Sequence, residues 1–134
     1  MQRLISVLLP VLLAVSGCMS DREFVRVENG QFVMGDDTVN FVGTNFWYGP
    51  IIASEGRGGD RARLEKELNL LNELGVNNLR ILVGSDGPEG VAYKVEPVLQ
   101  TEPGVYNDTL LRGLDYLLAE MAERSMHAVL YFNN

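Results

Sequence analysis

The stretch GVNNLRILVG, residues 75–84, decides how the rest of the sequence is interpreted. Leu79, Ile81, Leu82 and Val83 form a short apolar run that indicates a strand buried on both faces. Arg80 stands in the middle of this run. Arginine is almost never fully buried without a partner, because an unpaired buried charge costs several kcal/mol. The folded protein therefore has to expose Arg80 to water or place an acceptor against it.

The sequence on the amino-terminal side of this strand predicts a helix. Asp60 is a candidate N-cap, and Gly75 stands where a C-cap glycine belongs. Between them, four leucines recur at helical spacing: Leu64, Leu68, Leu71 and Leu74. Charged residues occupy the opposite face, so this segment is expected to be an amphipathic helix.

The same alternation of strand and helix continues in both directions. Residues 39–47 are apolar enough for a central strand, and residues 127–132 for a third one. Asn107 or Asp108 caps a second helix, whose expected buried stripe is Leu110, Leu114, Leu117 and Met121. Upstream, Asn29-Gly30 predicts a hairpin between residues 24–27 and 31–34, followed by a turn at residues 35–37.

Alternating strands and helices predict an α/β fold with a parallel sheet. A doubly wound dinucleotide fold needs a glycine fingerprint after its first strand, and "GTNFWYG" is aromatic where a phosphate loop must be small. The two long loops, residues 48–59 and 84–106, both follow strands, which is typical of the functional face of a (β/α)8 barrel. Such a barrel needs about 250 residues. Residues 24–134 are therefore expected to be its N-terminal portion: a hairpin, then strand–helix–strand–helix–strand, incomplete in this chain.

The first residues predict an export signal rather than part of the fold. One charge at Arg3 precedes an apolar run, Leu4 to Val15, that is too short to span a bilayer. Cys18, the only cysteine, follows Val15-Ser16-Gly17 and resembles the lipidated cysteine of the bacterial lipobox. Residues 1–17 would then be a lipoprotein signal peptide and residues 18–23 a tether. An ordinary signal peptide cut near Gly17 is the alternative.

By its resemblance to bacterial lipoproteins, the segment after Cys18 implies an anchor in the outer membrane of the cell envelope, because no acidic residue stands next to the cysteine. The charge of the chain argues against nucleic acid as a partner. It has 11 basic and 18 acidic residues, a formal net charge of −7, and no basic run. No spacing of side chains indicates a metal site, and no cofactor is expected.

Three segments, "VGTNFWYG", "LNELGVNNLRIL" and "EPGVYNDTLLRGLDYLLAEMAERSMHAVLYFNN", in this order resemble the start of glycoside hydrolase family 5, and most of all its endo-β-1,4-mannanases. The resemblance covers residues 24–134. It implies a (β/α)8 barrel whose bottom is closed by the hairpin. It also implies activity on β-mannan or a related plant polysaccharide, and a monomer when the protein is full-length.

The resemblance also implies roles for individual residues. Arg80 matches the arginine that hydrogen-bonds the catalytic nucleophile, an accessory role suited to the planar fork of donors on a guanidinium. Trp47 and Tyr48, at the end of the first barrel strand, would bind sugar rings, although one of the two is expected to be core. Asn133 and Asn134 would bind sugar hydroxyls, or form a turn. Asn45 is a weaker candidate for the barrel mouth.

Hydrolysis with retention of configuration needs two carboxyl groups about 5–5.5 Å apart. In the family these are glutamates after the fourth and seventh strands, so both are expected beyond Asn134, and residues 1–134 alone are expected to be inactive. Two alternatives stay open: a β-1,4-glucanase of the same family, and a glycan-binding lipoprotein without catalytic acids.

Overall fold

The computed structural model describes residues 24–132. The chain divides into two compact units between Val39 and Asn40, and each is described by itself. Residues 1–23, which include Cys18, lie outside the described part, as do Asn133 and Asn134. Between residues 24 and 132, no helix is long and apolar enough to cross a bilayer.

The first unit is a small antiparallel sheet of β1 (Arg26–Glu28), β2 (Gln31–Met34) and β3 (Asp37–Thr38), in that order. Asn29 and Gly30 have φ angles of 50° and 78°, the pair of positive values that a tight two-residue hairpin turn requires. Glu28 lies opposite Gln31, so the predicted hairpin is confirmed. The second turn covers residues 35–36, one residue fewer than expected, and leads into β3, which the sequence did not predict.

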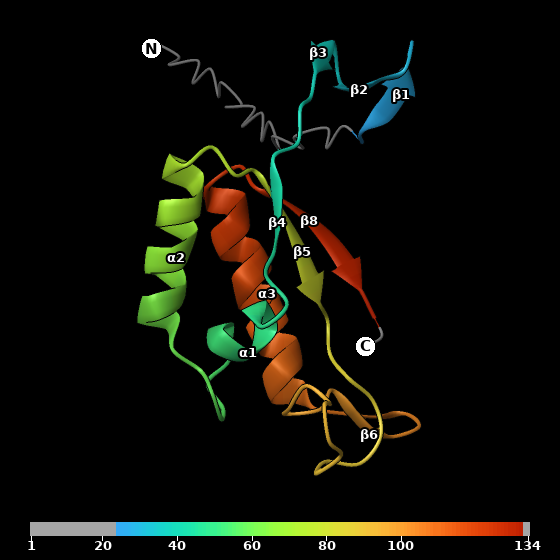
Figure 1. The fold of residues 1–134 in the computed structure, drawn as a ribbon, viewed down its shortest axis with the longest axis vertical. Coiled ribbons are helices and arrows are strands. Elements are labelled where there is room, and N and C mark those ends of the chain that lie inside the picture. Colours follow the sequence, from blue (N-terminus) through green and yellow to red (C-terminus); the bar gives the residue numbers. More distant parts are fainter. Residues whose placement is uncertain (1–23, 133–134) are drawn as a thin grey trace, which may run out of the picture. The chain divides into compact units, whose positions relative to one another are not determined.

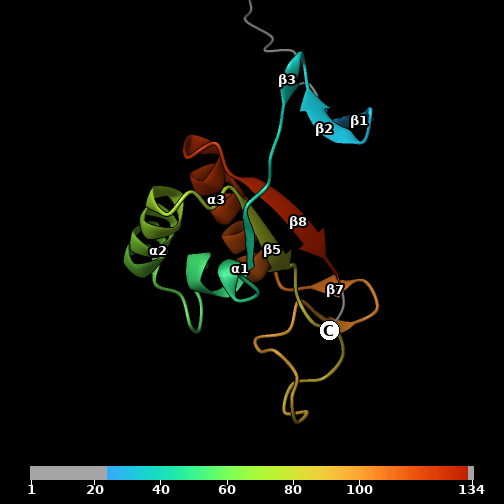
Figure 2. The same ribbon diagram turned by 45° about the horizontal axis from the view of Figure 1, so that its top comes forward.

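The second unit is built on a parallel sheet of β4 (Gly43–Asn45), β5 (Asn78–Leu82) and β8 (His127–Tyr131), with β5 in the centre. Two helices follow β4, α1 (Gly49–Ala53) and α2 (Arg61–Glu73), and α3 (Asp108–Glu123) precedes β8. Figures 1 and 2 show the three helices together on one side of this sheet. The predicted strand–helix–strand–helix–strand order is confirmed.

The expected strand over residues 39–47 is wrong in length, since β4 covers only Gly43–Asn45. Before it, the side chain of Asn77 makes two bonds to the backbone: its Oδ1 accepts from Val42 N at 2.8 Å, and its Nδ2 donates to Asn40 O at 2.7 Å. After it, the chain turns into α1, which has Pro50 in its first turn. We name the pairing of Asn77 with residues 40 and 42 the Asn77 clamp.

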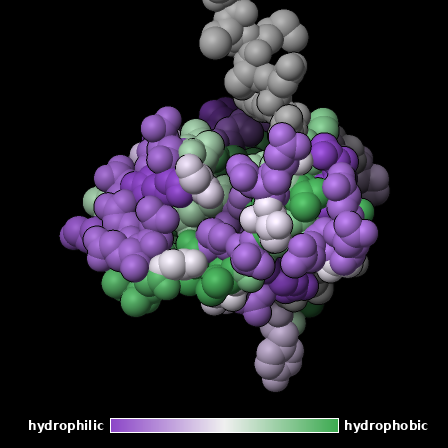
Figure 3. Space-filling view, turned by 90° about the horizontal axis from the view of Figure 1, so that it is seen from above, coloured by the Kyte–Doolittle hydropathy of each residue, from purple (hydrophilic) through white to green (hydrophobic). Residues whose placement is uncertain are grey.

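The helix ends follow the predicted capping residues. Asp60 Oδ1 accepts from Arg63 N at 2.9 Å, and Asn107 Oδ1 accepts from Thr109 N at 3.1 Å. Gly75 has a φ of 79°. The next residue, Val76, donates from its N–H to Leu71 O at 2.9 Å, which completes a Schellman motif. On the left of Figure 3, over α2, the surface is mostly hydrophilic, as the charged face of this helix predicts.

The leucine stripe of α2 is only partly buried. Leu64 and Leu68 are fully buried, whereas Leu74 is 69% exposed, so its expected place in the stripe is wrong. Leu74 is the C-cap residue, where the helix ends and its face no longer follows the helical period. In α3 the stripe is nearly as expected: Leu110, Leu117 and Met121 are buried and Leu114 is partly buried.

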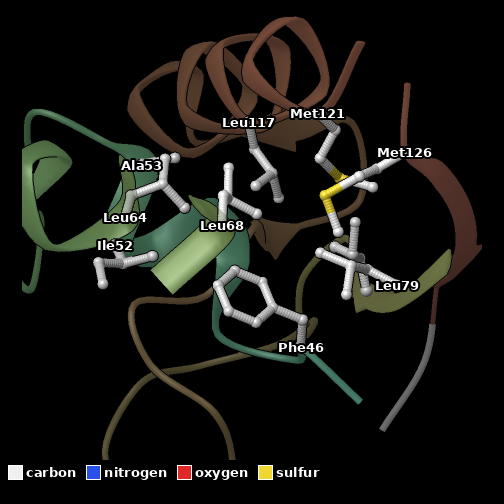
Figure 4. Packing of buried hydrophobic residues seen from close by; sticks show 10 residues of the cluster. Phe46, Ile52, Ala53, Leu64, Leu68, Leu79, Leu117, Met121 and Met126 are labelled. Atoms are coloured by element: carbon white, nitrogen blue, oxygen red, sulfur yellow. The ribbon is translucent and has the colours of Figure 1, made fainter. Parts of the chain in front are cut away.

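The core lies between the sheet and the three helices. In Figure 4 the side chains of Phe46, Leu68 and Leu117 point toward one another, and Leu79 meets two methionines near α3. Gly113 brings α1 and α3 close together, because a Cβ at this position would stand 2.3 Å from Pro50 O. The loop expected over residues 48–59 is thus wrong in part, because it contains the largely buried helix α1.

The long loop after β5 has some secondary structure of its own. β6 (Gln100–Glu102) and β7 (Val105–Tyr106) form a two-stranded hairpin, and Asp86 forms a bridge with Gln100. Ser85 Oγ donates to Val95 O and is buried. Figure 2 shows this segment at the end of the sheet where β5 and β8 finish.

Candidate functional site

The candidate site lies on the face of the sheet that the helices do not cover. Asn45 of β4, Arg80 of β5 and Val129 of β8 are neighbours in register, so their side chains share this face. Together with Gly43, Thr44 and Asn78 they line a hollow of about 440 Å³. We call this the open face of the sheet.

Arg80 is exposed on the open face, so the prediction that its strand is buried on both faces is wrong at this residue. Leu79 and Ile81 are fully buried on the helix side. The centre of the Arg80 guanidinium lies 3.6 Å from the centroid of the Tyr131 ring, and Nη1 donates a long hydrogen bond of 3.4 Å to Asn45 Oδ1. Within residues 24–132, no acidic side chain lies within ion-pair distance of it.

Trp47 lies at the carboxyl end of β4 and is 47% exposed. It lines a second hollow, of about 270 Å³, with Leu82, Val95 and Tyr131. Tyr131 therefore contacts Arg80 on one side and borders the same hollow as Trp47. The structure thus links Trp47 and Arg80 through Tyr131.

Tyr48 takes a different direction from Trp47. Its hydroxyl donates to Glu67 Oε2 on α2 at 2.6 Å, and Arg63 Nε donates to the other oxygen of Glu67 at 2.6 Å. The Tyr48 ring lies 4.6 Å from the ring of Phe46, a core residue. Partial burial raises the pKa of Tyr48 to about 12, and the hydrogen bond and charge of Glu67 act in the same direction. The structure therefore joins Tyr48 to α2 and not to Arg80.

Glu96 is the carboxylate of the long loop that bonds within the described part of the chain. Glu96 Oε1 accepts from Gly90 N at 2.5 Å, and its Oε2 lies 3.7 Å from Arg57 Nη1. Lys94 Nζ donates to the backbone oxygen of Asp86 at 2.5 Å. Among the described residues, no group of three or more His, Cys, Asp or Glu side chains is placed to hold a metal ion.

Tyr131 is the residue of this site that sequence reasoning missed. The strand alternation in "HAVLYF" carries the signal, because it places His127, Val129 and Tyr131 on one face. The register then sets Tyr131 beside Leu82, two residue pairs beyond Arg80 and therefore on the same face. Asn45, a weaker candidate from the sequence, is next to Arg80. Asn133, Asn134 and Cys18 lie outside the described residues.

Comparison with known proteins gives the same family as the resemblance found in the sequence. The sequence profile of the family described as GH family 5 beta-mannosidase-like matches residues 22–134. Mannan endo-1,4-beta-mannosidase 3 of Oryza sativa subsp. japonica is 31% identical over 111 residues, which are 82% of this chain and 22% of that protein. Mannan endo-1,4-beta-mannosidase 3 of Solanum lycopersicum is 28% identical over 130 residues, 97% of this chain and 30% of that protein.

Among solved structures, the glycoside hydrolase family 5 mannosidase from Rhizomucor miehei matches with a TM-score of 0.76 and 35% identity. The match covers 81% of this chain and 27% of that structure. This chain thus spans about a quarter of the length of the proteins it matches, and its sheet is the first part of the same (β/α)8 fold. The expected fold class is confirmed, and the chain belongs to glycoside hydrolase family 5, as a member of the beta-mannosidase-like family.

Proposed function

We propose that the whole protein hydrolyses the β-1,4 bonds of mannan from within the polymer, with retention of configuration. Residues 24–132 supply part of the barrel and part of its cleft, and the two catalytic glutamates come from later barrel strands. The observation that carries the proposal is that Arg80 is exposed on the open face and contacts Tyr131, which borders the hollow lined by Trp47. The mannan endo-1,4-beta-mannosidases that match this chain support the choice of substrate.

Arg80 would act through the nucleophile. A retaining glycosidase uses one carboxylate to attack the anomeric carbon and a second carboxyl group to protonate the leaving oxygen and then activate water. The nucleophile has to be ionised and correctly turned at the moment of attack. A guanidinium presents parallel N–H donors that favour the ionised carboxylate and fix its plane. Arg80 has such donors on the side of the sheet where the barrel interior would lie.

Trp47 would act on the sugar. The faces of a pyranose ring carry C–H groups, which pack against the electron-rich face of an aromatic ring. The indole of Trp47 is about half exposed and borders a hollow at the carboxyl ends of the strands, where the sites of such barrels lie. Trp47 is therefore the aromatic of this chain that we assign to substrate. Tyr48, held by α2, would support it from behind through an edge-to-face contact of 5.4 Å.

A second candidate is a mannosidase that removes single mannose units from chain ends. It is favoured by the 35% identity with the Rhizomucor miehei mannosidase, for which a structure in complex with mannosyl-fructose is known. A β-1,4-glucanase and a glycan-binding protein without catalytic acids are the other outcomes that the test below separates.

We propose also that Cys18 carries a lipid and holds the protein in the bacterial outer membrane. The support is the Val15–Gly17 sequence directly before the only cysteine of the chain. The enzyme would then act as an anchored monomer at the cell envelope.

The test is hydrolysis by the purified full-length protein, with residues 1–134 alone as a second sample. We expect mannohexaose to give mainly mannobiose and mannotriose, and proton NMR of fresh product to show the β-anomer first. Mannose as the sole early product would favour the mannosidase, and cleavage of cellohexaose alone would favour the glucanase. Hydrolysis of neither substrate would favour the glycan-binding protein without catalytic acids. Activity of residues 1–134 alone would contradict the placement of the catalytic glutamates.

A further inference from the structure

Tyr131 supports Arg80 through its ring. Arg80 pairs in register with Val129, and Leu82 pairs with Tyr131, so Tyr131 stands two residue pairs beyond Arg80 and on the same face. The guanidinium carbon lies 3.6 Å from the ring centroid, well inside the range of a cation–π contact. The contact joins adjacent strands of a hydrogen-bonded sheet, so the register brings the two side chains within reach of each other.

The contact uses the face of the guanidinium and leaves its edges available. The five N–H donors of arginine lie in the plane of the group. Among the described side chains, only Asn45 accepts from one of them, through Nη1 at 3.4 Å. A ring against the face and an amide at one edge restrict both the position and the rotation of the plane. The remaining donors stay free for a carboxylate.

We infer that Tyr131 is a positioning residue for Arg80. Its ring holds the guanidinium plane in the orientation in which the fork meets the nucleophilic carboxylate, and Asn45 limits rotation within that plane. The inference rests on the proposed function. Without the ring, the flexible arginine stem samples several rotamers, and only some of them present the fork to the carboxylate.

Tyr131 also borders the hollow beside Trp47, so a direct contact with substrate is the competing role. The two roles differ in kinetics. Loss of a positioning residue affects the chemical step and lowers kcat, whereas loss of a uniform sugar contact raises KM and leaves kcat unchanged.

The experiment compares Tyr131→Leu and Tyr131→Phe in the full-length protein with mannohexaose as substrate. We expect Tyr131→Leu to lower kcat at least fivefold with KM within twofold of the wild type. Tyr131→Phe keeps the ring and should stay within twofold in both. Tyr116→Leu is the matched control, because Tyr116 stacks on Arg61 at 4.0 Å on the helix side, and it should change neither constant. If Tyr131→Leu lowers the melting temperature strongly, Tyr131→Met takes its place, because the unbranched methionine side chain fills irregular gaps more readily.

A second measurement does not depend on activity. Phenylglyoxal modifies arginine side chains at a rate set by their exposure and mobility, and peptide mass spectrometry gives that rate for Arg80 alone. We expect a several-fold faster modification of Arg80 in Tyr131→Leu and an unchanged rate in Tyr131→Phe and Tyr116→Leu.

The outcomes separate the two proposals. Equal modification rates, or a raised KM with unchanged kcat, would overturn the positioning role. If the wild-type protein hydrolyses no β-mannoside, the proposed function fails, and the modification rates still decide whether Tyr131 holds Arg80.

Discussion

The contacts of the Arg80 guanidinium show which of its surfaces are used within the described part of the chain. One face lies against Tyr131, and one N–H donates to Asn45. The side chain is exposed, so the electrostatic cost of burial that the sequence suggested is not incurred in the described part of the chain. What distinguishes Arg80 from an ordinary surface arginine is the planar stack, and a lysine cannot reproduce it.

Arg80→Lys in the full-length protein should therefore keep the charge and lose the fork. We expect kcat for mannohexaose to fall at least about tenfold, which corresponds to roughly 1.4 kcal/mol of transition-state stabilisation. Arg112→Lys, an exposed arginine on α3, is the matched control and should leave kcat unchanged. An Arg80→Lys enzyme with wild-type kcat would mean that Arg80 is an ordinary charge on the strand.

Trp47→Ala should weaken substrate binding. A stacked sugar ring is worth on the order of 1 kcal/mol, so the dissociation constant for mannohexaose should rise about fivefold. Titration calorimetry measures this constant on full-length protein made inactive by substitution of its catalytic nucleophile. Tyr116→Ala, an aromatic truncation on α3, should bind as the unsubstituted protein does. Unchanged affinity in Trp47→Ala would assign the indole to packing alone.

At the scale of elements, the sequence predicted what depends on local chemistry. Asp60, Asn107 and Gly75 fix helix ends through bonds to residues a few positions away, so they could be recognised without the fold. Helix α1 could not be recognised from the sequence, because five residues are too few to show a helical period. Its glycine and proline suggested a loop. The same distinction holds for the residues of the site. Arg80 could be recognised from the sequence as a charge within an apolar strand, whereas the role of Tyr131 depends on the register of two strands.

The contact of α1 with α3 is sensitive to a single methyl group. Gly113→Ala would place a Cβ 2.3 Å from Pro50 O, with Ser54 Cβ at 2.9 Å, so the helices have to separate. We expect a loss of about 1–3 kcal/mol in the free energy of unfolding, although alanine has the higher helix propensity. Urea titration measures it. The exposed neighbour Arg112→Ala should cost little, and an equal loss there would show that the contact with α1 is not the cause.

The link from Tyr48 to α2 predicts a loss of stability in alkali. The folded state holds the Tyr48 proton up to a pKa of about 12, against 10.0 for an ordinary tyrosine. Its contribution is therefore fully present below pH 10 and is lost as pH rises toward 12. Tyr48→Phe should make the free energy of unfolding fall less steeply in this range, as urea titrations at several pH values would measure. Burial also raises the pKa of Tyr116, so part of the slope should remain in the variant. An unchanged slope would contradict the link.

At the scale of the whole molecule, the described sheet has two edges, since β4 and β8 pair only with β5 among residues 24–132. The exposed side chains near one edge are apolar, with Val129 50% and Phe132 73% exposed. In the matched proteins, which are about four times as long, a barrel of this kind continues beyond such edges. The proposed cleft would be completed by those further strands.

The proposed anchor is tested on the whole protein in a bacterial host. Cys18→Ser should move the protein from the membrane fraction to the soluble fraction, because a lipid chain holds it through burial of its methylene groups. Fractionation with immunoblotting measures the shift, and Ser20→Ala serves as the neighbouring control. Intact mass of the wild type should show the added acyl groups. A wild-type mass without them would contradict lipidation.

The Asn77 clamp bears on the order in which the molecule assembles. The clamp joins residues only 35 and 37 positions apart, and it fixes the entry of β4 against the start of β5. A nascent chain can therefore set the register of its first parallel pair once Asn78 has left the ribosome, before β8 has been synthesised. The later strands of the barrel would then add to a template that is already aligned, which limits the slippage to which parallel pairing is otherwise prone.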